Sequence, residues 1–289
     1  MWYLGLLLSL ARADFAVVGD WGRAGTDAQL EMAHTLNSLD IDFVISTGDN
    51  FYPAGLSSVT DPQAHDWVRV YQAKVPWYVV LGNHDYYDNA QAQVDMTSVY
   101  SMWHMPARYY DQNIGDTHVW FLDTTPLLEN NHVHRDKVQS WMDLEQQRDN
   151  AMAQYNWLED GLRSSTAERK IIVGHHPLWT FGEHAHMDND ELRVRISEWM
   201  TTYNVESYIC GHDHNLQHVT AYGLQEFISG SGAWSYEWDW VTGKRFSDTA
   251  ELHYASSEHG FLLVSDKTYS FYSANGLKLY SVQLGTLLE

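Results

Sequence analysis

The chain has 289 residues, 44% of them hydrophobic and 14% aromatic, so it can bury a sizeable core and is neither disordered nor fibrous. Its 38 acidic and 17 basic residues give a formal net charge of −21, which argues against nucleic acid and anionic membrane surfaces as partners, because both would be repelled. A small phosphorylated substrate held by a local positive centre, such as a metal, stays compatible with this charge. The single cysteine, Cys210, excludes an intrachain disulfide.

Residues 1–13 predict a secretory signal peptide. The apolar run from Trp2 to Leu10 is too short to span a bilayer, and Ala11-Arg12-Ala13 offers an A-x-A cleavage pattern before Asp14. The run has no Lys or Arg before it, and the alternative is a hydrophobic first strand. We therefore expect cleavage after Ala13, a secreted or lumenal protein, no membrane association once the signal is removed, and one folded domain over residues 14–289.

Five short apolar runs, each followed by a polar cluster, predict strands buried on both faces. In chain order they are Phe15–Val18 before Gly19-Asp20, Phe43–Ile45 before Gly48-Asp49, Trp77–Leu81 before Gly82-Asn83-His84-Asp85, Ile171–Val173 before Gly174-His175-His176, and Tyr208–Cys210 before Gly211-His212-Asp213-His214. After the first run, the stretch from Ala28 to Leu39 predicts a helix, with Leu30, Ala33, Leu36 and Leu39 at three-residue spacing.

The C-terminal part has a different pattern. The runs 260–264, 269–272 and 277–280 are separated by Asp266-Lys267 and Asn275-Gly276, as in antiparallel hairpins. Strand–helix–strand order in the first part predicts mostly parallel strands, whose carboxyl ends collect ligand-binding residues. The fold class is therefore α/β, a single domain of two packed mixed β-sheets flanked by helices.

Seven residues near those strand ends are competent metal ligands. Buried carboxylates and imidazoles crowded together stay repulsive or unsatisfied unless a cation lies between them. A mixed oxygen and nitrogen set with one amide and one phenol suits two metals, one hard and trivalent and the other divalent. The seven are Asp20, Asp49, Tyr52, Asn83, His175, His212 and His214.

The order of these motifs resembles the five motif blocks of the purple acid phosphatases. The blocks are Asp20-Trp21-Gly22, Gly48-Asp49-Asn50-Phe51-Tyr52, Gly82-Asn83-His84-Asp85, Val173-Gly174-His175-His176-Pro177 and Gly211-His212-Asp213-His214. The chain is most similar to the short, tartrate-resistant type within the calcineurin-like metallophosphoesterases, from about Phe15 to the C-terminal hairpins. Tyr52 is the most informative position, because most members of the wider superfamily lack this tyrosine. The resemblance also implies their four-layer sandwich.

The resemblance further implies a role for each residue. Asp20, Tyr52 and His214 would bind Fe(III), Asp49 would bridge both metals, and Asn83, His175 and His212 would bind a divalent ion (Fe, Zn or Mn). His84 and His184 match the two substrate-contacting histidines. The implied activity is secreted acid phosphatase: hydrolysis of phosphate monoesters by attack of a metal-bound hydroxide, with small phosphorylated substrates. We expect a monomer.

Two alternatives stay open at this point. The first is a phosphodiesterase or nucleotide hydrolase with the same metals, and the second is an iron-binding redox protein, against which His84 and His184 argue.

Three further features have more than one interpretation. His176 is expected to line the pocket, the motif's register giving the ligand role to His175. Cys210 is expected to be a buried apolar residue. The cluster Trp234, Tyr236, Trp238 and Trp240 either walls a substrate cleft or packs its loop onto the core.

Overall fold

The computed structural model describes residues 13–285 except 24, 129–140, 186–188 and 237–247. The predicted signal peptide, apart from Ala13, therefore lies outside the described residues, and so do Trp238 and Trp240. Within the described part, no helix combines the length and apolar character needed to cross a membrane.

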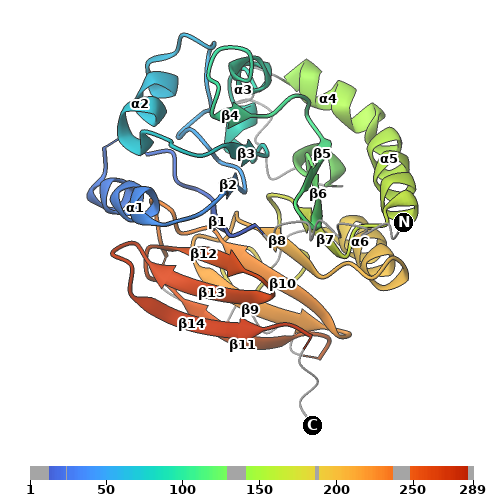
Figure 1. Cartoon of the computed structure of the whole chain (residues 1–289). Helices are drawn as coiled ribbons and strands as arrows, with labels where there is room; N and C mark the ends of the chain where they lie inside the picture. Colours follow the sequence, from blue (N-terminus) through green and yellow to red (C-terminus); the bar gives the residue numbers. More distant parts are fainter. Residues whose placement is uncertain (1–12, 24, 129–140, 186–188, 237–247, 286–289) are drawn as a thin grey trace, which may run out of the picture.

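Two seven-stranded mixed sheets form the framework (Figure 1). Sheet A has the strand order β14 (Lys278–Gln283), β13 (Thr268–Ser273), β12 (Gly260–Ser265), β1 (Phe15–Val18), β2 (Phe43–Ser46), β3 (Trp77–Val79) and β4 (Trp103–His104). Sheet B has the order β11 (Glu251–Ser256), β9 (Leu216–Ala221), β10 (Leu224–Ser229), β8 (Ser207–Cys210), β7 (Arg169–Val173), β6 (Thr117–Phe121) and β5 (Tyr110–Ile114). The expected α/β fold with two packed mixed sheets is confirmed.

All five predicted runs form strands, divided between the two sheets. β1, β2 and β3 are parallel neighbours in sheet A, and β7 and β8 are parallel neighbours in sheet B. The expected hairpins are the antiparallel pairs β12–β13 and β13–β14, with positive φ at Asp266 in the first turn and at Gly276 in the second. Since parallel strands end at the same edge of their sheet, each sheet delivers its polar residues to one edge.

Within the residues that the structure describes, six α-helices cover the outer faces. They are α1 (Asp27–Ser38), α2 (Pro62–Tyr71), α3 (Gln91–Met96), α4 (Trp141–Asp149), α5 (Ala151–Ser164) and α6 (Asp190–Thr202), joined by the short 3-10 turns η1 (His84–Tyr86) and η2 (Thr125–Leu127). The predicted helix is α1, but Leu30 is 47% exposed, whereas Met32, Ala33 and Leu36 are buried. A helix advances roughly 100° per residue, so a strict three-residue spacing drifts off the buried face.

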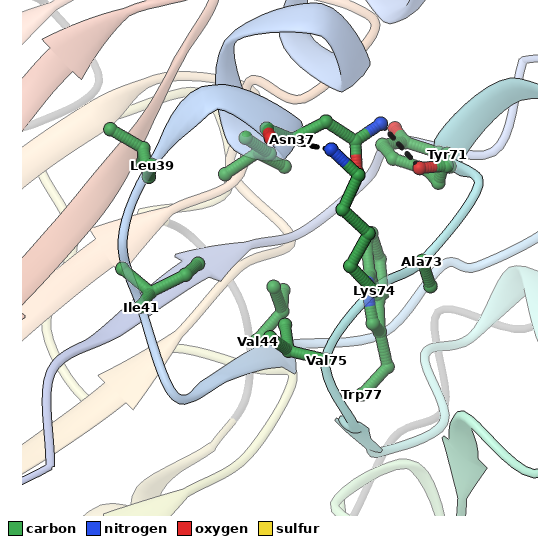
Figure 2. A pocket seen from close by; sticks show the side chains of 10 residues that line it. Asn37, Leu39, Ile41, Val44, Tyr71, Ala73, Lys74, Val75 and Trp77 are labelled. Carbon is green, nitrogen blue, oxygen red and sulfur yellow. Dashed lines mark hydrogen bonds between the residues drawn. The ribbon is translucent and has the colours of Figure 1, made fainter.

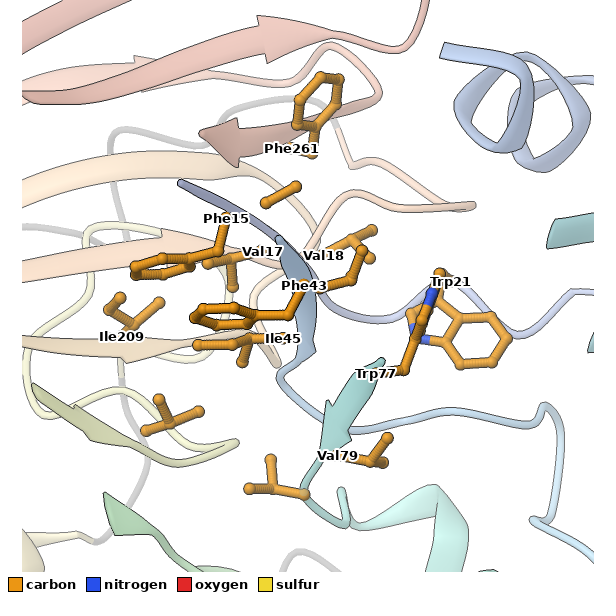
Figure 3. Packing of buried hydrophobic residues seen from close by; sticks show 14 of the residues in the cluster. Phe15, Val17, Val18, Trp21, Phe43, Ile45, Trp77, Val79, Ile209 and Phe261 are labelled. Carbon is orange, nitrogen blue, oxygen red and sulfur yellow. The ribbon is translucent and has the colours of Figure 1, made fainter. Parts of the chain in front are cut away.

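The alternation of side chains along the strands of sheet B separates two cores. Val119, Phe121 and Ile209 pack between the sheets with residues of sheet A, while Trp120 and Tyr208 pack against α5 and α6. Figure 3 shows the inter-sheet core around Phe15 and Phe43, whose rings stack with centroids 4.7 Å apart. This double packing fixes the strands whose carboxyl ends carry the polar clusters.

A small pocket of about 30 Å³ opens at the opposite, amino-terminal ends of β2 and β3 (Figure 2). Lys74 Nζ donates a hydrogen bond to the Asn37 carbonyl at 3.2 Å, and Asn37 Nδ2 donates to the Tyr71 carbonyl at 2.5 Å. Neither a carboxylate nor a histidine lines this pocket. It has room for about one water molecule and does not contribute to the site described below.

Candidate metal centre

The seven predicted ligands lie together where the carboxyl ends of the two sheets meet. Asp20 accepts a hydrogen bond at Oδ2 from the backbone N–H of His212 at 3.0 Å, which joins a loop of sheet A to a loop of sheet B. Asp20, Asp49 and His214 offer ligand atoms within 4.8 Å of one another, and so do His175, His176 and His212. Asp49 belongs to the first group and also lies next to His175 of the second, so it connects the two groups.

The first group surrounds the Tyr52 hydroxyl. Its oxygen lies 3.1 Å from Asp20 Oδ1, 2.9 Å from Asp49 Oδ2 and 3.0 Å from His214 Nε2, and all four side chains are buried. One phenol proton can serve only one carboxylate, so at least one of the two carboxylate contacts has no proton to share. A cation bound among these four atoms would satisfy all of them.

The charges around Tyr52 also favour a cation bound among these side chains. Burial raises the pKa of the Tyr52 phenol well above its usual range, and the carboxylates of Asp20 and Asp49 raise it further. A tyrosinate at this position therefore needs a strongly charged cation beside it. The donor set of phenol, carboxylates and imidazole fits a hard trivalent ion.

The second group is organised around His175. Its Nδ1 donates to the Thr47 carbonyl at 2.8 Å, which leaves Nε2 as the acceptor in the neutral ring. Nε2 faces Asn83 Oδ1 at 3.1 Å and His212 Nδ1 at 3.2 Å. Burial, followed by the neighbouring histidines, lowers the pKa of His212 well below its usual range, so its ring is neutral, as metal binding requires. These three residues fit a divalent ion.

Asp49 faces both groups. Its Oδ2 contacts the Tyr52 hydroxyl at 2.9 Å, and its Oδ1 lies 3.6 Å from His175 Nε2 and accepts a hydrogen bond from the His84 N–H at 2.8 Å. A carboxylate with one oxygen toward each group has the geometry expected of a bridging ligand.

Three of the residues in these loops have an unusual backbone conformation. Asp20, Asp49 and His212 adopt positive φ angles of 58°, 51° and 68°, a region that non-glycine residues rarely occupy. Close packing explains the glycine before Asn83. A Cβ on Gly82 would lie 2.1 Å from Asp49 Oδ1 and 2.4 Å from the Asp49 nitrogen, so a side chain there would displace the shared carboxylate.

The two predicted catalytic histidines flank the cluster on different sides. The His84 ring packs on the Tyr52 ring at 4.6 Å, and its Nδ1 donates to the Pro53 carbonyl at 2.7 Å. The His184 ring packs on His212 at 4.1 Å, with its side chain 26% exposed. In both rings Nδ1 is engaged with the protein, so Nε2 is the atom that can meet a substrate.

The structure adds a partner for His184 that the sequence alone did not reveal. His184 Nδ1 donates to the buried Asp213 Oδ1 at 2.7 Å, and the His184 backbone N–H donates to the same oxygen at 3.0 Å. Burial lowers the pKa of His184, but the hydrogen bond and charge of Asp213 outweigh it, so the net pKa is raised. Asp213 lies between two predicted metal ligands in the motif Gly211-His212-Asp213-His214. The sequence signal that could have identified it is a carboxylate at this position, where a buried charge needs a partner.

Other buried polar groups tie down the loop that carries His184. The Glu226 carboxylate accepts hydrogen bonds from the backbone of Leu178 at 2.7 Å and Trp179 at 2.9 Å. Gln217 Oε1 accepts a hydrogen bond from the Phe181 N–H at 2.9 Å. Sequence periodicity carries no signal for these contacts, because strands β9 and β10 follow the loop by more than thirty residues.

The structure gives the positions of His176, Tyr236 and Cys210, three residues with more than one interpretation in the sequence. His176 is buried beside His212, with ring centroids 4.6 Å apart, and its Nδ1 lies 2.8 Å from the Thr124 hydroxyl. The Tyr236 ring stacks on His214 at 4.8 Å and 2°, so this part of the aromatic cluster walls the site. Cys210 is buried in β8, as expected.

Known proteins are similar to this chain in sequence. The profile of the family described as calcineurin-like phosphoesterase matches residues 13–216. Purple acid phosphatase 4 of Arabidopsis thaliana is 31% identical over 95% of this chain and 84% of its own length. Human tartrate-resistant acid phosphatase type 5 is 30% identical over 93% of this chain and 90% of its own length.

Two solved structures show the same fold at lower identity. The Plasmodium protein described as GAP50, the anchor in the inner membrane complex, has a TM-score of 0.75 at 23% identity and covers 94% of this chain and 88% of its own. Purple acid phosphatase PPD1 from yellow lupin has a TM-score of 0.60 at 15% identity, over 94% of this chain and 53% of its own. The chain belongs to the calcineurin-like phosphoesterases, a family of hydrolases, and is a member of the purple acid phosphatases within them.

Proposed function

We propose that this protein is a secreted acid phosphatase that hydrolyses phosphate monoesters at a binuclear Fe(III)–divalent metal centre. Asp20, Tyr52 and His214 would hold the ferric ion, Asp49 would be shared, and Asn83, His175 and His212 would hold iron, zinc or manganese. The observation that carries the proposal is Asp49, whose two oxygens face the Tyr52 group and the His175 group.

The bound metals would supply Lewis acidity toward the phosphoryl oxygens and toward the attacking water. The protein's own part is to hold the donor atoms in place before metal arrives. The Thr47 carbonyl fixes the tautomer of His175 through Nδ1, which turns Nε2 toward the cluster. The Asp49 carboxylate is oriented by the His84 backbone N–H.

His184 supports an acid pH range. Because the buried Asp213 raises its pKa, the ring carries a proton on both nitrogens under mildly acidic conditions. Its Nε2–H would donate that proton to the leaving oxygen of the ester, and the imidazolium would become a neutral imidazole. His84, on the Tyr52 side, would contact the phosphoryl group through Nε2.

Secretion and the domain boundary at residue 14 are part of the same proposal. Their support is the A-x-A pattern at Ala11-Arg12-Ala13 and the position of β1, which begins at Phe15 and lies inside sheet A between β12 and β2. The net charge of −21 supports small phosphorylated substrates over nucleic acid.

Metal analysis combined with two substrates tests the proposal. The purified protein should contain two metals per chain, absorb visible light when oxidised, and hydrolyse p-nitrophenyl phosphate faster than bis(p-nitrophenyl) phosphate at acid pH. Faster hydrolysis of the diester would favour the phosphodiesterase alternative. Iron without hydrolysis of either compound would favour the iron-binding redox protein, and an absence of iron would refute the proposed centre.

A further inference from the structure

Arg23 lies beside the proposed metal centre, in the loop that follows Asp20. Its Cζ is 3.2 Å from the centroid of the Trp234 ring and 5.5 Å from that of Tyr52. The guanidinium group therefore lies beside the ring of Tyr52, whose hydroxyl oxygen is among the clustered ligand atoms. Arg23 is thus a neighbour of a predicted metal ligand without being one of the seven.

The aromatic wall of the site holds Arg23. Trp234 and Tyr236 follow β10; the Trp234 ring lies 5.8 Å from the His214 ring and 5.6 Å from Tyr236. The Tyr236 backbone N–H donates to the His214 carbonyl at 3.1 Å, which fixes the wall to a predicted ligand. Stacking on Trp234 covers one face of the guanidinium plane and leaves the in-plane N–H groups to bind an anion such as phosphate.

No anionic partner from the described part of the chain satisfies Arg23. Its side chain makes none of the ion pairs seen there, and its Nε is buried without a hydrogen-bond partner. Arg69, Arg163, Arg169, Arg193 and Arg195, in contrast, each pair with a carboxylate. Leaving a buried donor such as the Arg23 Nε–H unpaired costs free energy.

We propose that Arg23 is a specificity-determining residue that binds a second phosphate, adjacent to the scissile one on the leaving-group side of the substrate. The inference rests on the proposed function for the position of the scissile phosphate. A guanidinium fork binds two oxygens of one phosphate, and its position beside the Tyr52 ring, next to the ligand atoms but not among them, favours the neighbouring phosphate of a diphosphate. Nucleoside diphosphates and related diphosphate compounds are thus the favoured substrate class.

Adenosine diphosphate and adenosine monophosphate form a matched substrate pair, because they share the nucleoside and differ in the second phosphate. Arg23→Gln should raise KM for the diphosphate about 10- to 100-fold, with kcat nearly unchanged, while values for the monophosphate stay within about threefold. Arg23→Lys, which keeps the charge without the planar fork, should recover part of the loss. Arg69→Gln, on the surface of α2, is the control and should match the wild type.

A binding measurement separates this inference from the proposed function. Calorimetric titration of the metal-loaded protein with methylenediphosphonate, which is not hydrolysed, should show weaker binding in Arg23→Gln, whereas phosphate should bind both proteins equally. Failure of the proposed function would appear as missing metal or missing activity on the monophosphate. The Arg23 inference is overturned if the variant loses both ligands equally, loses neither, or if the wild type does not bind methylenediphosphonate.

Discussion

His184 and Asp213 form a hydrogen bond of 2.7 Å between an imidazole that is 26% exposed and a fully buried carboxylate. The carboxylate lies between two predicted metal ligands, His212 and His214, yet its Oδ1 is directed to the His184 ring and to the His184 backbone. Thr180, in the loop that carries His184, donates to the other oxygen. The pair thus couples the position of the proposed proton donor to the strand end that carries the metal site.

Asp213→Asn tests this coupling through the pH dependence of kcat. Asp213 raises the pKa of His184, so its neutralisation should lower that pKa, and His184 should lose its proton at a lower pH. The alkaline limb of the kcat profile should therefore move to lower pH. Asp66→Asn, on the surface of α2, is the matched control. An unchanged alkaline limb with reduced kcat would mean that Asp213 acts only on loop structure.

His184 and His84 should differ in their response to the leaving group. Loss of a general acid typically costs 10²–10⁴-fold in rate, and the cost is largest for poor leaving groups such as alkyl alkoxides. His184→Ala should therefore be impaired far more on glycerol 2-phosphate than on p-nitrophenyl phosphate, whereas His84→Ala should be impaired equally on both. Both variants should keep their metal content.

The control for these variants is His253→Ala, on strand β11, where His253 Nε2 lies 2.7 Å from the Thr220 hydroxyl. It should retain wild-type rates on both substrates. Equal defects of His184→Ala on the two substrates would transfer the proton-donor role to His84 or to solvent.

The sequence predicted the strand ends well because each signal is local. A short apolar run followed by Gly-Asp or Gly-His needs no knowledge of distant residues, and the five runs became β1, β2, β3, β7 and β8. Contacts such as Glu226 with the backbone of Leu178 join segments 48 residues apart, and Asp213 with His184 joins segments 29 apart. Apolar periodicity describes burial along one element, so it cannot identify the partner of a buried polar group.

Tyr52→Phe should bleach the oxidised protein. The phenol oxygen is the atom that contacts Asp20, Asp49 and His214, and a phenyl ring keeps its shape while removing that oxygen. The visible absorption should disappear, as measured by spectroscopy together with iron analysis. Tyr222→Phe, at a tyrosine that is 76% exposed, should remain coloured. A coloured Tyr52→Phe protein with unchanged iron would refute tyrosinate ligation.

Asp49→Ala should remove both metals and the stability they supply. A ligand present at about 100 times its Kd stabilises the native state by about 2.7 kcal/mol, which corresponds to several degrees in Tm. A chelator should therefore lower the Tm of the wild type and leave that of Asp49→Ala nearly unchanged. Thermal unfolding with and without chelator measures this difference. Two metals retained per variant chain would exclude a bridging role.

We expect Glu226 to make the free energy of unfolding depend on pH. Burial raises the pKa of this carboxyl to about 8, against the hydrogen bonds from Trp179 and Leu178. Because the folded-state pKa lies above the unfolded value of about 4.5, the folded state binds more protons between these limits. The contribution of Glu226 is therefore fully present below pH 4.5 and is lost as the pH rises toward 8.

Replacing Glu226 with glutamine isolates its pH-dependent contribution to the free energy of unfolding. Glu226→Gln keeps the shape but offers one carbonyl oxygen to two backbone donors, so at pH 5 it should be less stable by about 1–3 kcal/mol. Since glutamine does not ionise, the deficit should shrink toward pH 8, by at most about 1.4 kcal/mol per pH unit. Urea unfolding at pH 5, 6, 7 and 8 in chelator measures it without the contribution of metal binding. Glu198→Gln, at an exposed carboxylate of α6, should show a constant difference from the wild type. A Glu226→Gln deficit that stays constant or widens with pH would show that the buried carboxyl is ionised throughout, held by the N–H groups of Leu178 and Trp179.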